Sequence, residues 1–321
     1  MITPLKLASK PTPIEFYTGV FPDFDFHIKR DDLTGLEGSG NKIRKLEYLL
    51  ADAENNGSDL IITCGGIQSN HCRATMYCCA KLGWQGVCVV KGEKPKIAEG
   101  NLLLDFLFNA QVEFLPTAQY LHKEDYIAEM IDDFKKKGHK PYFIPTGGSN
   151  GIGALGYIFA MDEMAAYIDR HKIDAVFCAV GSGGTYAGLL MGKYQSSLAV
   201  PVYGVLVDET PAFFEAKIKS IIGETEKVLE RKFPIRDTDI KLIDGYIGPG
   251  YGVPYDEEIA IIRQMARKGL ILDPVYTGKT FFGMVDKKSE LGFSNPLFIH
   301  TGGIFSVFAY PELKTQADFL K

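Results

Sequence analysis

The sequence lacks the usual marks of a metal-binding, membrane-spanning or nucleic-acid-binding protein. Its six cysteines form no Cys-x-x-Cys pair and no Cys/His cluster with the spacing of zinc ligands. No apolar run approaches the ~20 residues of a membrane-spanning helix, and the first residues lack the apolar core of a signal peptide. The net charge of -5 is too small to favour nucleic acid or an anionic membrane as a partner. We therefore expect a cytoplasmic protein with reduced, mostly buried cysteines and with no metal, nucleic-acid or membrane partner.

Repeats, low-complexity tracts and long linkers are also absent, although the 321 residues exceed the usual size of one domain. Short apolar runs that are typical of buried strands alternate with helical stretches. These runs are residues 59–63, 85–90, 175–180, 201–207 and 296–300. The alternation predicts an α/β fold with mostly parallel sheets flanked by helices. We expect a large domain formed by residues 1–45 and 156–321 and a small domain formed by residues 46–155.

Two glycine-rich segments match nucleotide-binding motifs only in part. Residues 35–42 almost spell a P-loop, but Asn41 interrupts the required Gly-Lys pair and Ile43 stands where Ser or Thr is needed. Residues 151–156 match Gly-x-Gly-x-x-Gly, but Pro145 and the glycines after it break the strand that should precede a dinucleotide site. We interpret the second segment as a loop that enters a helix.

Residues 181–185, Gly-Ser-Gly-Gly-Thr, are a better candidate for an anion site. They lie between an apolar strand and a helix start, where glycines let backbone N–H groups and the helix dipole face a phosphate. A tight turn without any ligand explains the same residues equally well, so both interpretations stay open. Residues 65–71 form a similar turn after an earlier strand, and they could receive a substrate carboxylate by the same physics.

Lys42 stands at the expected start of a helix, directly after Gly40 and Asn41. A solvated side chain is the default interpretation of any single lysine. However, the positive end of a helix dipole is an unfavourable place for a cation, and it lowers the pKa of an amine. A lysine of lowered pKa is suited to forming a Schiff base with a carbonyl compound.

Taken together, these segments resemble the fold-type-II pyridoxal-phosphate enzymes, and within them the family of D-cysteine desulfhydrase and 1-aminocyclopropane-1-carboxylate deaminase. The similarity extends over nearly the whole chain. Its most specific stretches are residues 29–32, 40–47, 65–71, 100–105, 248–254, 272–279 and 300–303. The resemblance implies a two-domain fold like that of the tryptophan synthase β-subunit, a homodimer, a small amino-acid substrate and pyridoxal 5'-phosphate as cofactor.

The resemblance also implies roles for individual residues. Lys42 matches the lysine that binds the cofactor covalently, and Asn70 matches the residue that hydrogen-bonds its ring oxygen. The remaining cofactor contacts implied are Gly181, Ser182, Gly183, Gly184 and Thr185 at the phosphate, with Thr277 and Thr301 at the pyridine nitrogen. The substrate carboxylate is expected at Ser69, Asn70 and His71, and the catalytic set is expected to be Lys42, Ser69, Tyr251 and Tyr276.

The predicted reaction depends on which side chains are expected beside the pyridine nitrogen of the cofactor. The ring-opening deaminases resemble one another in placing a glutamate at the position of Thr277 and a leucine at that of Thr301. A hydroxyl brings no charge to hold the nitrogen protonated, so the cofactor is a weaker electron sink, which suits elimination of a good leaving group. We expect a D-cysteine desulfhydrase that forms pyruvate, ammonia and hydrogen sulfide. In this reaction Lys42 is the expected base for the α-proton, with Ser69 as the alternative.

Three other functions stay open on the sequence. They are a 1-aminocyclopropane-1-carboxylate deaminase, a lyase for another β-substituted amino acid such as cysteate, and a regulatory protein that binds the cofactor without catalysis. The joint presence of Tyr251 and Tyr276 disfavours the last of these, because a protein that only binds the cofactor needs neither tyrosine.

Overall fold

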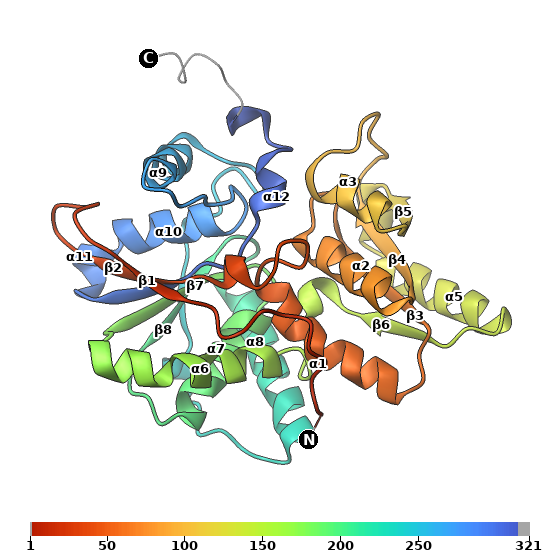
Figure 1. Ribbon diagram of the computed structural model, residues 1–321, viewed down its shortest axis with the longest axis horizontal. Coiled ribbons are helices and arrows are strands. Elements are labelled where there is room, and N and C mark those ends of the chain that lie inside the picture. Colours follow the sequence, from red (N-terminus) through yellow and green to blue (C-terminus); the bar gives the residue numbers. More distant parts are fainter. Residues whose placement is uncertain (1, 314–321) are drawn as a thin grey trace.

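The chain folds around two separate β-sheets, which lie on opposite sides of the molecule in Figure 1. The computed structural model describes residues 2–313. The larger sheet has the strand order β1-β2-β10-β7-β8-β9, and only the β1–β2 pair is antiparallel. Its strands are β1 (Ile14–Tyr17), β2 (Phe26–Lys29), β7 (Ala175–Val180), β8 (Val202–Leu206), β9 (Lys241–Ile243) and β10 (Pro296–Ile299).

The smaller sheet is fully parallel, with the order β5-β4-β3-β6. Its strands are β3 (Leu60–Gly66), β4 (Gln85–Lys91), β5 (Gln111–Leu115) and β6 (Pro141–Ile144). These two sheets confirm the predicted α/β class with mostly parallel strands. The residues at which the small domain begins and ends, 46 and 155 in our prediction, stay a prediction.

Alternating side chains of the strands bury both faces of each sheet, as parallel sheets require. In β3, Ile61 packs into one apolar cluster, while Leu60 and Ile62 pack into another on the opposite face. In β7, Val176 and Phe177 divide in the same way between the two clusters of the larger sheet. Continuous apolar runs of this kind are what made the strands visible in the sequence.

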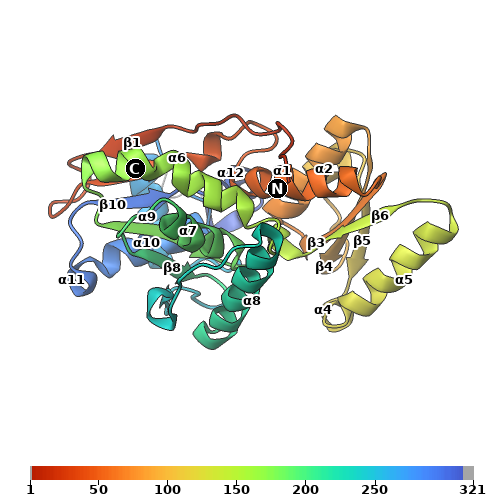
Figure 2. The same ribbon diagram turned by 90° about the horizontal axis from the view of Figure 1, so that it is seen from below.

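Helices cover these faces (Figure 2). Those of the smaller sheet are α2 (Asn70–Leu82), α3 (Gly100–Leu107), α4 (Thr117–Tyr120) and α5 (Lys123–Lys136). Those of the larger sheet are α6 (Leu155–His171), α7 (Gly184–Gln195), α8 (Pro211–Leu229), α9 (Asp256–Ala266), α10 (Thr277–Asp286) and α11 (Lys288–Leu291). Helix α12 (Ile304–Val307) packs against α3. Short 3-10 helices are η1 (Asp31–Leu33), η2 (Thr146–Gly148), η3 (Asp237–Asp239) and η4 (Pro311–Leu313). Within residues 2–313, no helix has the length and apolar character needed to cross a membrane.

Helix α1 (Asn41–Asn55) joins the two halves of the fold, because it packs against both α2 and α6. Twelve of its fifteen residues are buried, including the charged Arg44 and Lys45. Burying charge in a helix is costly unless each charge is paired. The fold therefore has to supply partners for this helix from several distant segments.

Arg44 receives its partners from residues before and after α1. Its guanidinium makes two hydrogen bonds of 2.8 Å to the carboxylate of Asp31 and one of 3.0 Å to Glu163 on α6. The hydroxyl of Tyr157 also donates to Asp31, at 2.6 Å. Burial alone would raise the pKa of Asp31, but the charge and hydrogen bonds of Arg44 hold it below its usual value. This network fixes α1 against the larger sheet.

Removal of Arg44 tests this network. In Arg44→Met, Asp31 and Glu163 lose their buried cation, and we expect the free energy of unfolding to fall by about 3–5 kcal/mol, measured by chemical denaturation. The control is Lys219→Met, which removes two exposed ion pairs, to Glu215 and Asp237, and is expected to cost at most about 0.5 kcal/mol. A loss below ~1 kcal/mol for Arg44→Met would contradict a stabilising role for the network.

Candidate active site

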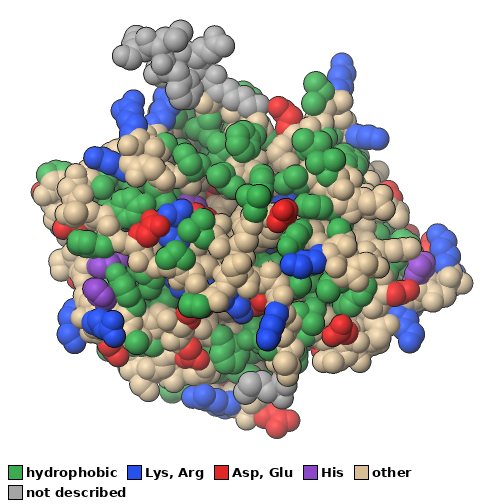
Figure 3. Space-filling view, in the orientation of Figure 1, with side chains coloured by type: hydrophobic (Ala, Val, Ile, Leu, Met, Phe, Trp, Pro, Cys, Tyr) green, Lys and Arg blue, Asp and Glu red, His purple; other side chains and the backbone are tan. Residues whose placement is uncertain are grey.

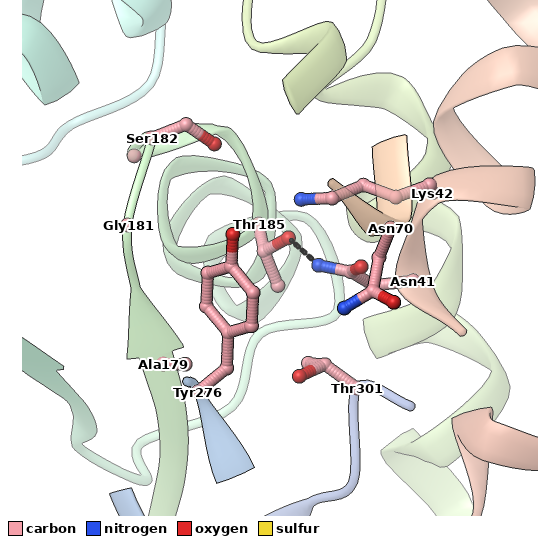
Figure 4. Close-up of a pocket in the computed structure, with 10 residues that line it drawn as sticks. Asn41, Lys42, Asn70, Ala179, Gly181, Ser182, Thr185, Tyr276 and Thr301 are labelled. Carbon is pink, nitrogen blue, oxygen red and sulfur yellow. Dashed lines mark hydrogen bonds between the residues drawn. The ribbon is translucent and has the colours of Figure 1, made fainter. Parts of the chain in front are cut away.

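A pocket lies where the carboxyl ends of β7 and β3 approach the start of α1. Crevices at the carboxyl ends of parallel strands are the usual ligand sites of such folds. The pocket is lined by Asn41, Lys42, Asn70, Ala179, Gly181, Ser182, Gly183, Thr185, Tyr276 and Thr301 (Figure 4). It opens into a larger cavity of about 210 Å³, which Lys42 and Tyr276 share and which Ser69, His71 and Tyr251 also line.

Lys42 reaches the pocket from the first turn of α1, and its amine points into the space between Ser182 and Asn70 (Figure 4). Only 8% of the residue is exposed. Burial lowers the pKa of this amine to about 8, and the negative charge of Asp273 opposes part of the shift. The side chain is thus held in a form from which the neutral, nucleophilic amine is readily available.

The glycine turn of residues 181–185 connects β7 to α7 and directs the N-terminus of that helix at the pocket. Gly183 has a φ of 81°, a left-handed conformation that favours glycine. A Cβ atom on Gly184 would lie 2.6 Å from Oγ of Ser149, so no side chain fits there. Thr185 accepts a hydrogen bond of 2.9 Å from the amide of Asn41, which ties this turn to the start of α1.

Lys45 adds a positive charge beside this turn, and the sequence analysis did not identify it. Its amine donates to the carbonyl of Gly147 and to Oγ of Ser149, both at 3.2 Å. Ser149 in turn accepts from the backbone N–H of Gly184, also at 3.2 Å. Burial, and then the charge of Lys42, hold the pKa of Lys45 well below its usual value. An anion bound at the glycine turn would relieve both effects.

His71 lines the cavity, and its hydrogen bond to Thr63 defines the tautomer of its imidazole ring. The hydroxyl of Thr63 donates to the carbonyl of Ile144 at 2.9 Å, so its oxygen must accept from Nε2 of His71 at 2.8 Å. Nδ1 is then an unprotonated acceptor, and no hydrogen-bond partner reaches it within residues 2–313. Burial and the charges of Lys42 and Lys45 hold the pKa of His71 well below its usual value. In this tautomer Nδ1 cannot donate to a substrate carboxylate, and the binding role expected for His71 stays a prediction.

Tyr251 and Tyr276 approach from the larger sheet, and their hydroxyl groups are hydrogen-bonded to each other. Although 42% of Tyr251 is exposed, its hydroxyl end lies in the cavity, and loss of water raises its pKa to about 12. Burial, and then the neighbouring Tyr251, raise the pKa of Tyr276 as well. Both hydroxyls therefore stay protonated at neutral pH and can donate hydrogen bonds to a departing group.

Thr301 and Thr277 differ in their placement. Thr301 lines the pocket (Figure 4). Thr277 is fully buried and is outside the pocket lining, because its hydroxyl donates to the carboxylate of Asp273 at 2.7 Å and accepts from the Asp273 N–H at the same distance. The carboxylate of Asp273 also accepts from the backbone N–H groups of Val275, Tyr276 and Thr277, where the chain enters α10. Of the two threonines predicted at the ring nitrogen, the structure brings only Thr301 to the pocket.

Comparison with known proteins decides the family. The chain matches the family described as "Pyridoxal-phosphate dependent enzyme" over residues 5–302. It is 45% identical over 316 residues to a Thermotoga maritima protein that carries the provisional name 1-aminocyclopropane-1-carboxylate deaminase, covering 95% of this chain and 97% of that protein. The chain belongs to the pyridoxal-phosphate-dependent enzymes.

Two further relatives narrow the position within this family. D-cysteine desulfhydrase of Klebsiella pneumoniae is 38% identical over 318 residues, covering 95% of each chain. The solved structure of a homologue of 1-aminocyclopropane-1-carboxylate deaminase superposes with a TM-score of 0.89 at 38% identity, covering 96% of this chain and 94% of the other. The chain is therefore an enzyme of the group to which both of these activities give their names.

The residues of the pocket fit the cofactor pyridoxal phosphate. Lys42 offers a buried amine to its aldehyde, and the glycine turn with Lys45 offers backbone N–H groups and a positive charge to its phosphate. Asn70 and Thr301 lie on the remaining sides of the pocket. When bound, the cofactor withdraws electrons from the α-carbon of an amino acid.

Lys42 is tested by spectroscopy of the purified protein. The wild type is expected to show the visible absorbance of a cofactor bound covalently to a lysine, and Lys42→Ala to lose it or to hold the cofactor only non-covalently. Reduction with borohydride followed by peptide mapping locates the modified residue. A label on Lys45 or on any other lysine would contradict the assignment.

Lys279 positions the loop that carries Tyr251. Its fully buried amine donates to the carbonyl groups of Ile247 (2.6 Å), Gly250 (3.0 Å) and Val253 (3.0 Å). Burial lowers the pKa of Lys279, and the nearby Glu258 opposes this shift. Burial also raises the pKa of Glu258, and the charge of Lys279 opposes that rise. Neither carboxyl oxygen of Glu258 has a hydrogen-bond partner within residues 2–313. The carbonyl groups of the loop are thus the main partners of the ammonium.

In Lys279→Met these three carbonyl groups lose their donor. We expect backbone amides of residues 247–253 to exchange with deuterium at least ~10-fold faster, since one charged hydrogen bond is worth more than about 1.4 kcal/mol. Mass spectrometry of the exchanged peptides measures this. The control is Lys287→Met, which removes an exposed ion pair near the end of α10. Equal exchange of residues 247–253 in the two variants would refute the role of Lys279.

Proposed function

We propose that this enzyme eliminates hydrogen sulfide from D-cysteine and forms pyruvate and ammonia. The observation that carries the proposal is the composition of the cofactor pocket, whose described lining contains the hydroxyl of Thr301 and no acidic side chain. A neutral neighbour cannot hold the pyridine nitrogen in its charged form. The α-carbanion then receives less stabilisation, and reactions in which a good leaving group departs at once are favoured.

The tyrosine pair supports the same proposal. The hydroxyls of Tyr251 and Tyr276 lie together in the cavity next to Lys42, and both are held protonated. A thiolate that leaves the β-carbon can accept hydrogen bonds from this pair. Lys42 is proposed as the base for the α-proton, with Ser69 as the alternative. Ser69 also caps α2, because its hydroxyl accepts from the N–H of Cys72 at 3.1 Å.

The principal alternative is opening of the ring of 1-aminocyclopropane-1-carboxylate, the activity that names the relative at 45% identity. A lyase for another β-substituted amino acid, such as cysteate, uses the same steps and differs only in the leaving group. The pocket lining disfavours ring opening, because the cyclopropane carbon is a poor leaving group and needs the strongest electron sink.

An assay of 2-oxo acid release compares the candidates directly. The panel contains D-cysteine, L-cysteine and cysteate, which give pyruvate, and 1-aminocyclopropane-1-carboxylate, which gives 2-oxobutanoate. We expect kcat/KM for D-cysteine to exceed that for the cyclopropane substrate at least ~100-fold, a barrier difference of roughly 2.7 kcal/mol. Efficient release of 2-oxobutanoate from the cyclopropane substrate would refute the argument from Thr301 and establish the alternative.

We further propose a homodimer in the cytoplasm. The six cysteines are unpaired and buried, which fits a reducing compartment. Hydrophobic side chains gather on the face shown in Figure 3, over α3 and α12, where Leu103, Leu107 and Ile304 are exposed. Contiguous exposed apolar groups favour association with a second copy. Light scattering of the purified protein would show a dimer, and a monomer at micromolar concentration would refute this proposal.

A further inference from the structure

A series of hydrogen-bonded polar side chains is buried behind Asn70, on the side away from the cofactor pocket. Arg73 is one turn further along α2, and Asn101 is the second residue of α3; neither has any exposed surface. Nε of Arg73 donates to Oδ1 of Asn101 at 3.2 Å. Nδ2 of Asn101 donates to Oδ1 of Asn70 at 2.9 Å. This series of hydrogen bonds thus connects the guanidinium of Arg73 with Asn70 in the pocket.

The direction of these hydrogen bonds is determined by the chemistry of their partners. A guanidinium can only donate, so the atom of Asn101 that faces Arg73 must be its oxygen. The amide nitrogen of Asn101 then lies on the other side, where it also donates to the main-chain carbonyl of Gln68 at 3.0 Å. A carbonyl can only accept, so this second contact requires the same orientation of Asn101.

The orientation of Asn70 follows from that of Asn101. Because Nδ2 of Asn101 donates to it, the oxygen of the Asn70 amide is the atom that faces α3. The NH₂ group of Asn70 is left facing the pocket, as Figure 4 shows. If the amide of Asn70 were rotated, its NH₂ group would face the NH₂ group of Asn101, so that two donors would oppose each other inside the protein. Its oxygen, an acceptor, would then face the ligand.

We infer that Arg73 and Asn101 are positioning residues that hold the NH₂ group of Asn70 toward the ring oxygen of the cofactor. The inference rests on the cofactor-binding role proposed for Asn70. A donor at this point stabilises the negative charge of the ring oxygen, whereas the carbonyl oxygen of a rotated amide would repel it.

Arg73 is suited to this task because, within residues 2–313, no acidic side chain lies at hydrogen-bond distance from its guanidinium. Its other nitrogens donate to the main-chain carbonyls of Glu37 and Ser39, the latter at 2.9 Å. These carbonyls belong to the segment that leads into α1. Burial lowers the pKa of Arg73 to about 10, and the nearby Asp105 opposes the shift, so the guanidinium stays charged at neutral pH. Arg73 therefore connects the segment before Lys42 with the amide of Asn70.

Replacing the amide of Asn101 by a carboxylate should reverse the direction of the hydrogen bond between residue 101 and Asn70. In Asn101→Asp the residue keeps its shape and its contact with Arg73, but it can only accept. The NH₂ group of Asn70 is then drawn toward the new carboxylate, and its oxygen turns to the cofactor. We expect the pKa of the bound cofactor, read from the pH dependence of its visible absorbance, to rise by about one unit or more. We also expect its dissociation constant from the apoprotein to increase ~10-fold or more.

The matched control is Asn295→Asp. Nδ2 of Asn295 donates to the main-chain carbonyls of His171 and Lys172, so the variant loses the same kind of contact at the start of β10, away from the pocket. It is expected to lose stability and to keep the wild-type cofactor spectrum and affinity. A cofactor change in this control equal to that in Asn101→Asp would mean that general loosening, not orientation, is being measured, and would overturn the inference.

A double-mutant comparison tests whether the effect passes through Asn70. Asn70→Ala removes the donor and should by itself raise the pKa of the cofactor. Adding Asn101→Asp to Asn70→Ala should then give no further rise, because the residue on which Asn101 acts is gone. A full additional shift of the cofactor pKa would overturn the inference that Asn101 acts through Asn70. Should Asn101→Asp fail to fold, Asn101→Ser, which removes the amide donor without adding charge, is expected to shift the pKa in the same direction by a smaller amount.

None of these measurements uses a substrate. An enzyme that binds the cofactor but releases no pyruvate from D-cysteine would defeat the proposed function and leave the spectra interpretable. Unchanged spectra and affinity in a folded Asn101→Asp variant would defeat the relay and leave the proposed function standing.

Discussion

The amine of Lys42 has to be kept from water and still face an open cavity, and this requirement organises much of the fold. Its helix, α1, is buried along most of its length between the two sheets and carries two further cations within its first five residues. Each of these cations needs a partner inside the protein. Arg44 finds one in Asp31 and Glu163, whereas the hydrogen-bond partners of Lys45 within residues 2–313 are neutral oxygens next to the glycine turn. The charge of Arg44 is thus neutralised on the side of the larger sheet, and an amine without a paired anion is left where a phosphate is expected.

The rest of the site is assembled by segments that end at the same edge. The glycine turn after β7 and the polar turn after β3 each lead into a helix whose N-terminus faces the pocket. Their backbone N–H groups supply positive potential without any side chain. The opposite side is formed by α10 and the loop of Tyr251, which Lys279 holds through three carbonyl groups. Lys279 and Arg73 thus each hold a backbone segment beside the pocket through main-chain carbonyl groups.

Most of the local structure could be predicted from the sequence, because its causes are local. The apolar runs of β3, β4, β7, β8 and β10 mark strands buried on both faces, and α2 begins at Asn70 as its polar turn suggests. The predicted lysine, glycine turn, Asn70, Tyr276 and Thr301 all line one pocket. Thr277 lies in the same motif as Tyr276, but successive residues at a helix start point in different directions. Its hydroxyl is consumed by Asp273, four residues earlier in the chain.

The sequence by itself determined the α/β class, the family and the chemical group that each motif can contribute, because glycine turns, helix starts and buried strands depend on neighbouring residues. It could not determine which buried groups form hydrogen bonds or ion pairs with one another. Lys45 gains its importance from Gly147 and Ser149, about a hundred positions away, and the amide of Asn70 is oriented by Asn101 on another helix. The tautomer of His71 depends on Thr63 and through it on Ile144. Such choices between donor and acceptor, or charged and neutral forms, are made only when distant segments exclude water together.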